Sequence, residues 1–316
     1  MSTGEGESGA QGAPHVPVLP EETLGALLDG RDPAVLDGWF VDATLGAGGH
    51  AELLLERCPR VRLLALDQDP TALALGRERL ARFGDRVRLR RGRHSELCRV
   101  VRKERVGRLQ GVLLDLGVSS MQLDRAERGF SFADDGPLDM RMDPDRERTA
   151  ADIVNRWDEG DLADLLYYEG DETRSRRIAR AIVEARRRAP FLRTAALAEL
   201  VARTVGGGGK VHPATKTFQA LRRAVNEEGD ELLAGLQAAE HWLDAGGTLA
   251  VISFHSGEDR VVKRFLKDGS REGRWELQGK KPVAPGAAEV RENRRARSAR
   301  LRGARRLRKG EGGLER

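Results

Sequence analysis

The sequence contains little cysteine, little lysine and few aromatic residues. Cys58 and Cys98 are its two cysteines among 316 residues, and they lack the close spacing of a metal-binding motif. Two cysteines cannot build the disulfide framework of a small secreted domain, so we expect a reducing, cytoplasmic environment and no structural zinc.

Long apolar runs are also missing. No run approaches the roughly 18 consecutive apolar residues that a membrane-spanning helix requires. Residues 1–14 are rich in Gly, Ser and Glu and lack the basic and apolar regions of a signal peptide. We therefore expect no membrane association, a cytoplasmic location and a disordered tail over residues 1–14.

Positive charge is concentrated near the end of the chain. The net charge is +5, but residues 291–309 hold nine arginines and one lysine against one acid, Glu292, so the remaining residues sum to −4. This distribution predicts a basic C-terminal arm over residues 291–316 that binds a phosphate-carrying partner through residues such as Arg295 and Arg297. The alternative is a solvated, unstructured tail.

A glycine-rich turn provides the strongest functional signal. Residues 46–51, Gly-Ala-Gly-Gly-His-Ala, lie between an apolar strand predicted over 38–43 and a helical run over 51–57. Glycines at such a turn let the chain reverse and let the backbone approach a ligand closely. A second predicted strand over 61–66 ends in Asp67, the position from which a carboxylate binds ribose hydroxyls. The pattern predicts a nucleotide-like cofactor.

The choice of cofactor depends on Asp42. The turn also satisfies the permissive dinucleotide fingerprint, which keeps a NAD-dependent oxidoreductase open as an alternative. Asp42 lies inside the strand before the turn and suits the amino group of an amino-acid moiety, which S-adenosylmethionine has and NAD lacks. S-adenosylmethionine is therefore the predicted cofactor. Alternatively, these residues have only a structural role: the glycines form an ordinary turn and Asp67 caps the helix beginning near Pro70.

Alternating strand and helix patterns predict an α/β fold with a doubly wound parallel sheet. Further strands are expected over 87–90, 110–115 and 247–254, whereas residues 158–225 read as helices. We therefore predict a cofactor-binding domain formed by residues 15–129 and 227–290, interrupted by an all-helical substrate domain over residues 130–226. Such an insertion would form one wall of a cleft at the carboxyl edge of the strands.

Several motifs resemble the signature of the bacterial RsmH family, also called MraW. They cover residues 115–124, 126–132 and 135–143, with further similarity at 15–19, 177–183, 212–219, 252–256 and 296–298. The resemblance implies a Rossmann-like class I methyltransferase fold. It also implies S-adenosylmethionine-dependent methylation of the N4 amino group of a decoding-centre (P-site) cytidine in 16S ribosomal RNA, with the small ribosomal subunit as partner.

The resemblance and the turn together define the predicted cofactor site. Its members are Asp42, Gly46, Gly48, Gly49, His50, Asp67, His94, Asp115 and Gln122. His94 stands where many relatives have a phenylalanine that packs on the adenine. If His94 were protonated, cofactor affinity would depend on pH, and this is a hypothesis motivated by the substitution alone.

Two residues are predicted to act on the base. Asp115, at the end of a strand, would accept hydrogen bonds from the cytosine amine and direct its lone pair towards the methyl group. His255 would receive the proton released after transfer. The alternatives are that Asp115 only holds the cofactor and that His255 is a structural hydrogen-bond donor.

The remaining expectations concern RNA, metal and assembly. Lys216, Arg222 and Arg223 are candidates for RNA phosphate contact or members of a solvated helix face. Phe130 and Phe132 would stack on an extruded base or pack in a core. The acidic set Asp134, Asp135, Asp139 and Asp143 is read as a turn-rich loop, so no metal is expected. A homodimer and a ribosome-assembly factor without catalysis both remain open.

Overall fold

The computed structural model describes residues 17–206 and 211–308. The tail predicted over residues 1–14 lies outside the described residues, as does the end of the predicted arm, residues 309–316. Within the described ranges, no helix is long and apolar enough to cross a membrane.

A seven-stranded sheet with strand order β3-β2-β1-β4-β5-β7-β6 forms the larger part of the molecule. The strands are β1 (Gly38–Asp42), β2 (Val61–Asp67), β3 (Val87–Arg91), β4 (Leu109–Asp115), β5 (Leu243–Ser253), β6 (Trp275–Leu277) and β7 (Arg300–Arg306). Strands β1 to β5 pair in parallel, and β7 runs antiparallel to both β5 and β6. The prediction of a Rossmann-like class I methyltransferase sheet is confirmed, and the order reverses between β1 and β4, where ligands bind in such sheets.

Helices cover both faces of the sheet because its strands are apolar on both sides. Leu64 and Leu66 of β2 join the core on one face, and Leu63 and Ala65 join the core on the other. The first face packs against α4 (Leu97–Glu104), α11 (Glu228–Trp242) and α12 (Ser256–Arg271). The second packs against α1 (Pro20–Leu28), α2 (Gly49–Arg57) and α3 (Pro70–Leu80).

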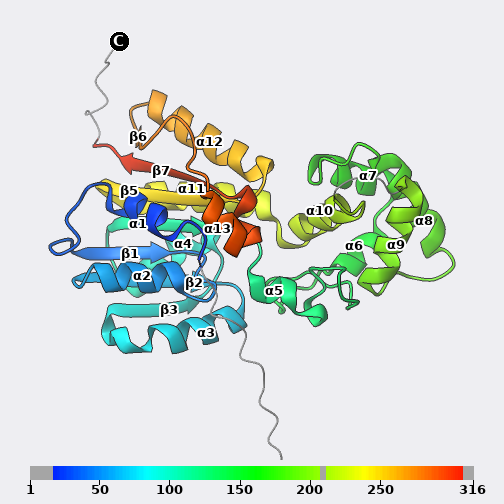
Figure 1. The fold of residues 1–316 in the computed structure, drawn as a ribbon, viewed down its shortest axis with the longest axis horizontal. Coiled ribbons are helices and arrows are strands. Elements are labelled where there is room, and N and C mark those ends of the chain that lie inside the picture. The colour runs from blue at the N-terminus through cyan, green and yellow to red at the C-terminus, as the bar shows by residue number, and fades with distance from the viewer. Residues whose placement is uncertain (1–16, 207–210, 309–316) are drawn as a thin grey trace, which may run out of the picture.

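A helical lobe lies beside the sheet (Figure 1). It contains α6 (Ala150–Arg156), α7 (Glu159–Tyr168), α8 (Ser175–Arg186), α9 (Thr194–Val205) and α10 (Thr215–Asn226). Its apolar side chains, from Phe130 to Val225, form a core cluster of their own. Phe130 is buried there, and the ring centroid of Phe132 lies 4.8 Å from that of Phe218, so both phenylalanines pack in the core instead of facing the pocket described below.

The C-terminal segment corrects one prediction. Residues 291–308 do not form a separate basic arm, because Arg300–Arg306 make up strand β7 inside the sheet. Leu301 and Ala304 of this strand are buried, whereas its four arginines are exposed or half-buried. Because four of its seven residues are arginines, the segment lacks the apolar pattern by which a strand is predicted. The segment before it forms the helix α13 (Ala287–Glu292) and a short 3-10 turn, Arg294–Ser298.

Candidate active site

The turn after β1 has the backbone conformation that its glycines predict. Gly46 and Gly48 have positive φ angles of 53° and 81°. Gly49 begins α2, and a Cβ atom there would lie 3.0 Å from the ring of Pro17. Gly46 and Gly49 line a pocket at the carboxyl ends of β1, β2 and β4, whereas Gly48 supports the turn from outside the lining. The turn therefore forms one wall of the pocket.

Asp67 joins the end of β2 to this turn. Its Oδ2 accepts a hydrogen bond from the amide of Gly46 at 2.8 Å, and its Oδ1 accepts one from the amide of Asp69 at 2.8 Å. The N-cap of α3 is Asp69, which accepts from the amide of Thr71 at 2.9 Å, so Asp67 is not the cap of that helix. Burial raises the pKa of Asp67 to about 6. Asp67 lines the pocket.

Asp42 and Asp115 add two carboxylates at the neighbouring strand ends. Asp42 is only 3% exposed and accepts from the amide of Thr44 at 3.1 Å, so it lies behind the pocket wall. Its pKa is raised to about 7 because it is buried and lies near Asp67. Asp115 lines the pocket, and its pKa is raised well above the ordinary value by burial and by the charges of Asp42 and Glu258. The site thus concentrates carboxyl groups, and burial favours their protonated forms.

Asp115 has one oxygen without a hydrogen-bond partner. Oδ1 is buried and accepts no hydrogen bond from any described residue. Oδ2 lies 3.7 Å from Nε2 of His50, which also lines the pocket from the start of α2. The backbone amide of Asp115 is fixed by Oγ1 of Thr44 at 2.6 Å. The geometry leaves a pocket-lining acceptor available to a ligand.

Gln122 lines the pocket but uses its amide to hold the surrounding loops. Its Oε1 accepts from the amide of Ser119, the N-cap of α5 (Ser120–Asp124), at 3.1 Å. Its Nε2 donates to Oδ2 of Asp69 at 3.0 Å, and Arg128 donates to the same oxygen at 2.7 Å. Both groups of the Gln122 amide are therefore engaged, so its contacts are those of a residue that positions the wall.

His94 lies at the other side of the pocket, against α11. The Cα of Gly235 faces it so closely that a Cβ there would lie 2.7 Å from Cδ2 of His94. Burial and the charge of Arg93 lower the pKa of His94 to about 4. The imidazole is therefore neutral between pH 5.5 and 8, which corrects the hypothesis that its protonation makes cofactor affinity pH-sensitive in this range.

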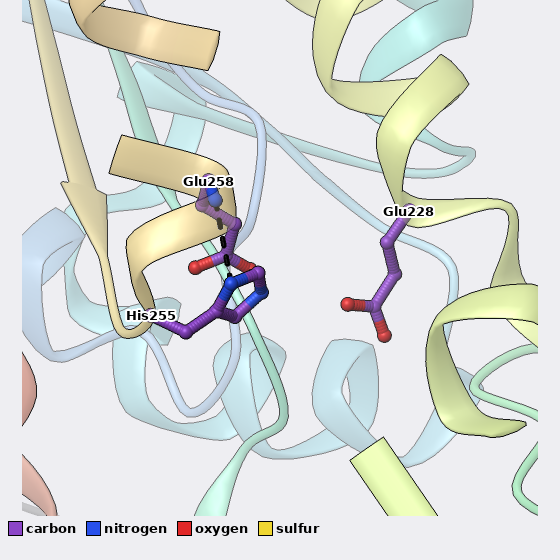
Figure 2. A group of neighbouring side chains, drawn as sticks. All are labelled: Glu228, His255 and Glu258. Carbon is purple, nitrogen blue, oxygen red and sulfur yellow. Dashed lines mark hydrogen bonds and ion pairs between the residues drawn. The ribbon is translucent and has the colours of Figure 1, made fainter. Parts of the chain in front are cut away.

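His255 caps a helix instead of facing the pocket. Its Nδ1 accepts a hydrogen bond from the amide of Glu258 at 3.3 Å, which makes it the N-cap of α12. Figure 2 shows His255 folded against Glu258, with Glu258 and Glu228 on either side of the ring. Glu258 and Glu228 line the pocket, and His255 does not. These contacts favour a structural role for His255. The alternative considered above was a structural hydrogen-bond donor, whereas in the structure the imidazole accepts the hydrogen bond.

Glu228, His255 and Glu258 bring ligand-type atoms within 4.8 Å of one another. Both oxygens of Glu228, however, accept hydrogen bonds at 2.8 Å from the guanidinium of Arg222. Glu258 accepts from the amide of Phe254 at 2.9 Å. The cluster is accordingly held by an arginine and a helix cap, and Nε2 of His255 lies 3.1 Å from Oε1 of Glu258.

Sequence analysis missed several residues of the pocket. The lining also includes Arg93, Asn226, Glu228, Glu231, Phe254, Glu258 and Asn293. Glu228 and Glu231 sit in the first turn of α11, and Arg93 pairs with Glu231 at 3.0 Å. The acidic run after Asn226 was the available signal, but only the return of the chain from the helical lobe brings it to the sheet.

The predicted RNA contacts separate into two groups. Arg222 pairs with Glu228, Arg223 pairs with Glu169 at 2.9 Å, and Lys216 donates to the carbonyl of Asp171 at 2.7 Å. These three residues therefore have partners inside the protein. Arg295 lines the pocket and pairs with Asp124, and Arg297 is exposed without an ion pair among the described residues.

The acidic set in the loop before α6 is also dispersed. Asp135 pairs with Arg193, Asp139 with Arg141, and Asp143 with Arg91. Asp134 is exposed. Each paired carboxylate thus has an arginine of its own, as expected for a turn-rich loop.

Comparisons with known proteins agree over nearly the whole chain. A family model described as the MraW methylase family matches residues 12–307. The chain is 52% identical over 311 residues to the "Ribosomal RNA small subunit methyltransferase H" of Methylobacterium sp. (strain 4-46), covering 92% of this chain and 90% of that one. It is 50% identical over 296 residues to the protein of the same name from Synechococcus elongatus, covering 93% and 95%. A solved rRNA methylase from Streptococcus thermophilus is 13% identical, with a TM-score of 0.44 over 93% of this chain and 100% of that one.

Proposed function

Because this chain belongs to the MraW methylase family, we propose that it methylates small-subunit ribosomal RNA with S-adenosylmethionine as methyl donor. The acceptor proposed is the N4 amino group of a decoding-centre (P-site) cytidine in 16S ribosomal RNA, with the small ribosomal subunit as partner. Membership in a methylase family leaves the oxidoreductase alternative without support. A homodimer stays a prediction.

The donor set of the pocket fits S-adenosylmethionine. This cofactor has a positive sulfonium and a positive amino group, and the pocket lining is acidic, with Asp67, Asp115, Glu228, Glu231 and Glu258. Asp67 would hold the ribose hydroxyls while it fixes the glycine turn, and Asp42 would attract the amino group from behind the wall. When bound, the cofactor supplies a methyl group that its sulfonium already activates for transfer.

The unpaired oxygen of Asp115 is the single observation that carries the assignment of the reacting group. Oδ1 is buried and accepts no hydrogen bond from the described residues, and Asp115 lines the pocket at the end of β4. It is proposed to accept a hydrogen bond from the cytosine amine, even when the carboxyl is protonated, since the carbonyl oxygen keeps its lone pairs. This would orient the amine for attack, and orientation of this kind is worth about 7 to 11 kcal/mol in favourable cases.

Glu258 replaces His255 as the proposed acceptor of the proton that the amine loses. It lines the pocket, and His255 does not. Burial alone would raise the pKa of Glu258, but the hydrogen bond and charge of His255, the charge of Arg222 and the amide of Phe254 together lower it. Glu258 is therefore a carboxylate at neutral pH, as an acceptor must be. Phe254, also in the lining, replaces Phe130 and Phe132 as the aromatic residue proposed to contact the base.

The test is incubation of the purified protein with S-adenosylmethionine and small subunits from a strain lacking the modification, followed by nucleoside mass spectrometry. New N4-methylcytidine is the expected product. Binding of the cofactor without this product would move the proposal to another acceptor. An Asp67→Ala protein that binds subunits but no longer methylates them would separate an enzyme from a non-catalytic assembly factor.

A further inference from the structure

Helix α12 packs against one face of the sheet (Figure 1). Glu258, in its first turn, lines the pocket, and Val262 and Leu266 are buried in the core on one side of the helix. The opposite side is formed by Arg260, Lys263, Arg264 and Lys267, and all four are exposed. Their spacing of three, four and seven residues places them on one face.

Within residues 17–206 and 211–308, none of these four cations forms an ion pair. The neighbouring strand β7 behaves differently, since Arg300 and Arg302 pair with the buried Asp259 and Arg306 pairs with Glu240. An exposed row of unpaired cations is a site at which a polyanion gains affinity by releasing counterions.

Lysines are concentrated near this face. The sequence has 47 arginines and only eight lysines, so a basic cluster that reflected only the overall composition would consist mainly of arginines. Half of the lysines nevertheless line one cavity between α12, α1 and the loop after β6: Lys263, Lys267, Lys280 and Lys281. Arginine-rich composition therefore does not account for this cluster.

Acidic groups lie near the cluster but leave its charge mostly uncompensated. Glu22 and Asp29 line the opposite wall of the cavity, and Asp29 is 3.5 Å from Arg305. At the far end of α12, Asp268 lies 3.6 Å from Arg271, and Glu272 pairs with Arg274 at 2.7 Å. The three acids that form ion pairs therefore pair with arginines outside the cluster.

We propose that the basic face of α12, with Lys280 and Lys281, binds the sugar-phosphate backbone of the ribosomal RNA next to the target nucleotide and leads it to the pocket. The inference rests on the proposed function. The face spans about 10 Å from Arg260 to Lys267 at 1.5 Å per residue, and it starts two residues after Glu258 of the pocket. Phosphate contacts of this kind position the substrate without reading its sequence.

The test compares two triple variants that lose the same charge. Lys263→Gln/Arg264→Gln/Lys267→Gln removes the α12 face. The matched control, Arg102→Gln/Lys103→Gln/Arg105→Gln, removes three exposed cations at the end of α4 that form no ion pair within the described ranges. Dissociation constants for small subunits and for purified 16S ribosomal RNA are measured at several salt concentrations, together with S-adenosylmethionine binding.

We expect the α12 variant to bind both RNA forms about ten-fold or more weakly, with a plot of log affinity against log salt shallower by about 2, at roughly 0.7 to 0.9 per lost phosphate contact. The α4 control should stay within about two-fold of the wild type, and cofactor binding should not change in either. A third variant, Lys263→Arg/Arg264→Lys/Lys267→Arg, retains the charge and should bind like the wild type.

Equal losses in the α4 and α12 variants would overturn the proposal, as would wild-type affinity in the α12 variant or a loss in the charge-retaining one. A loss restricted to assembled subunits would assign the face to a ribosomal protein and also overturn it. Methylation by the wild type is measured in parallel. If the wild type does not methylate the RNA, both the proposed function and this inference are wrong. If the wild type methylates the RNA and the α12 variant binds it as tightly as the wild type does, only this inference is wrong.

Discussion

Oδ2 of Asp67 accepts a hydrogen bond from the backbone amide of Gly46 at 2.8 Å, so the acid after β2 and the turn after β1 are one structural unit. The two residues are 21 positions apart in the sequence, and the parallel pairing of β1 with β2 brings them together. A change at Asp67 should therefore affect both the shape of the turn and the binding of the ribose.

Replacing Asp67 by alanine should weaken S-adenosylmethionine binding by about 10- to 100-fold, because about 1 to 3 kcal/mol is lost when buried amides such as that of Gly46 lose their acceptor. Isothermal titration calorimetry measures the affinity. Asp164→Ala, at an exposed position on α7, is the control and should bind normally. Wild-type affinity in Asp67→Ala would show that this carboxylate does not hold the cofactor.

Asp42→Asn should stabilise the cofactor-free protein at pH 8 and weaken cofactor binding. The pKa of Asp42 is raised from 3.8 to about 7 by burial, so between these values the folded protein holds a proton that the unfolded chain has lost. Stability of the wild type therefore falls as pH rises through this window. The asparagine cannot ionise and avoids this loss, which we expect to amount to about 1 to 3 kcal/mol at pH 8.

Urea unfolding of wild type and Asp42→Asn at pH 5 and pH 8 measures this effect. The advantage of the variant should be small at pH 5 and larger at pH 8. A difference that is the same at both pH values would show that Asp42 does not titrate in this window.

Affinity for S-adenosylmethionine should rise between about pH 5.5 and 7.5, because Asp67 ionises near pH 6 and Asp42 near pH 7 and both then attract the cation. His94 should not contribute, since its pKa is about 4. His94→Phe is therefore expected to change the affinity but to keep the shape of the pH profile. Loss of the pH dependence in His94→Phe would show that the imidazole of His94 is the group whose titration changes the affinity.

Gly235→Ala should reduce cofactor affinity without unfolding the protein. Its new Cβ would lie 2.7 Å from Cδ2 of His94 and would push the imidazole towards the pocket. Gly229→Ala, on the same helix, meets nothing within 4 Å and is the matched control. The control should stabilise the helix by up to about 1 kcal/mol and leave binding unchanged. Equal affinities in the two variants would show that His94 has room to move.

Arg302→Ala should destabilise the fold by about 3 to 5 kcal/mol, because it leaves the buried carboxylate of Asp259 without its main partner. Arg297→Ala removes an exposed arginine from the same basic segment and should have little effect on stability. Thermal unfolding of both variants compares them. Equal melting temperatures would show that β7 is held by its backbone pairing alone.

Local patterns in the sequence were sufficient to predict three features at the strand ends: the glycine turn after β1, the acid after β2 and the acid after β4. The continuous apolar run of β2 and the compact glycine turn are local properties, and both follow from short stretches of sequence. The helices of the lobe were predicted for the same reason, and α7 to α10 lie almost entirely within the predicted residues 158–225. Motif resemblance carried the identity of the family.

Tertiary structure decided which charged residues face the pocket. Arg222 and Arg223 looked like RNA contacts along the sequence, but Glu228 and Glu169 occupy their guanidinium groups. His255 looked like a base, but its Nδ1 is used to cap α12. The basic C-terminal segment looked like an arm, and pairing with β5 makes it a strand.

The sequence by itself determined the cofactor turn, the alternation of strands and helices and the family, because each depends on residues close together in the chain. Only the tertiary structure decided that Glu258 shares the pocket with Asp115 and that His94 lies against Gly235. These pairs are separated by more than a hundred residues. Their contacts arise from the packing of α11 and α12 on the sheet, which no local pattern specifies.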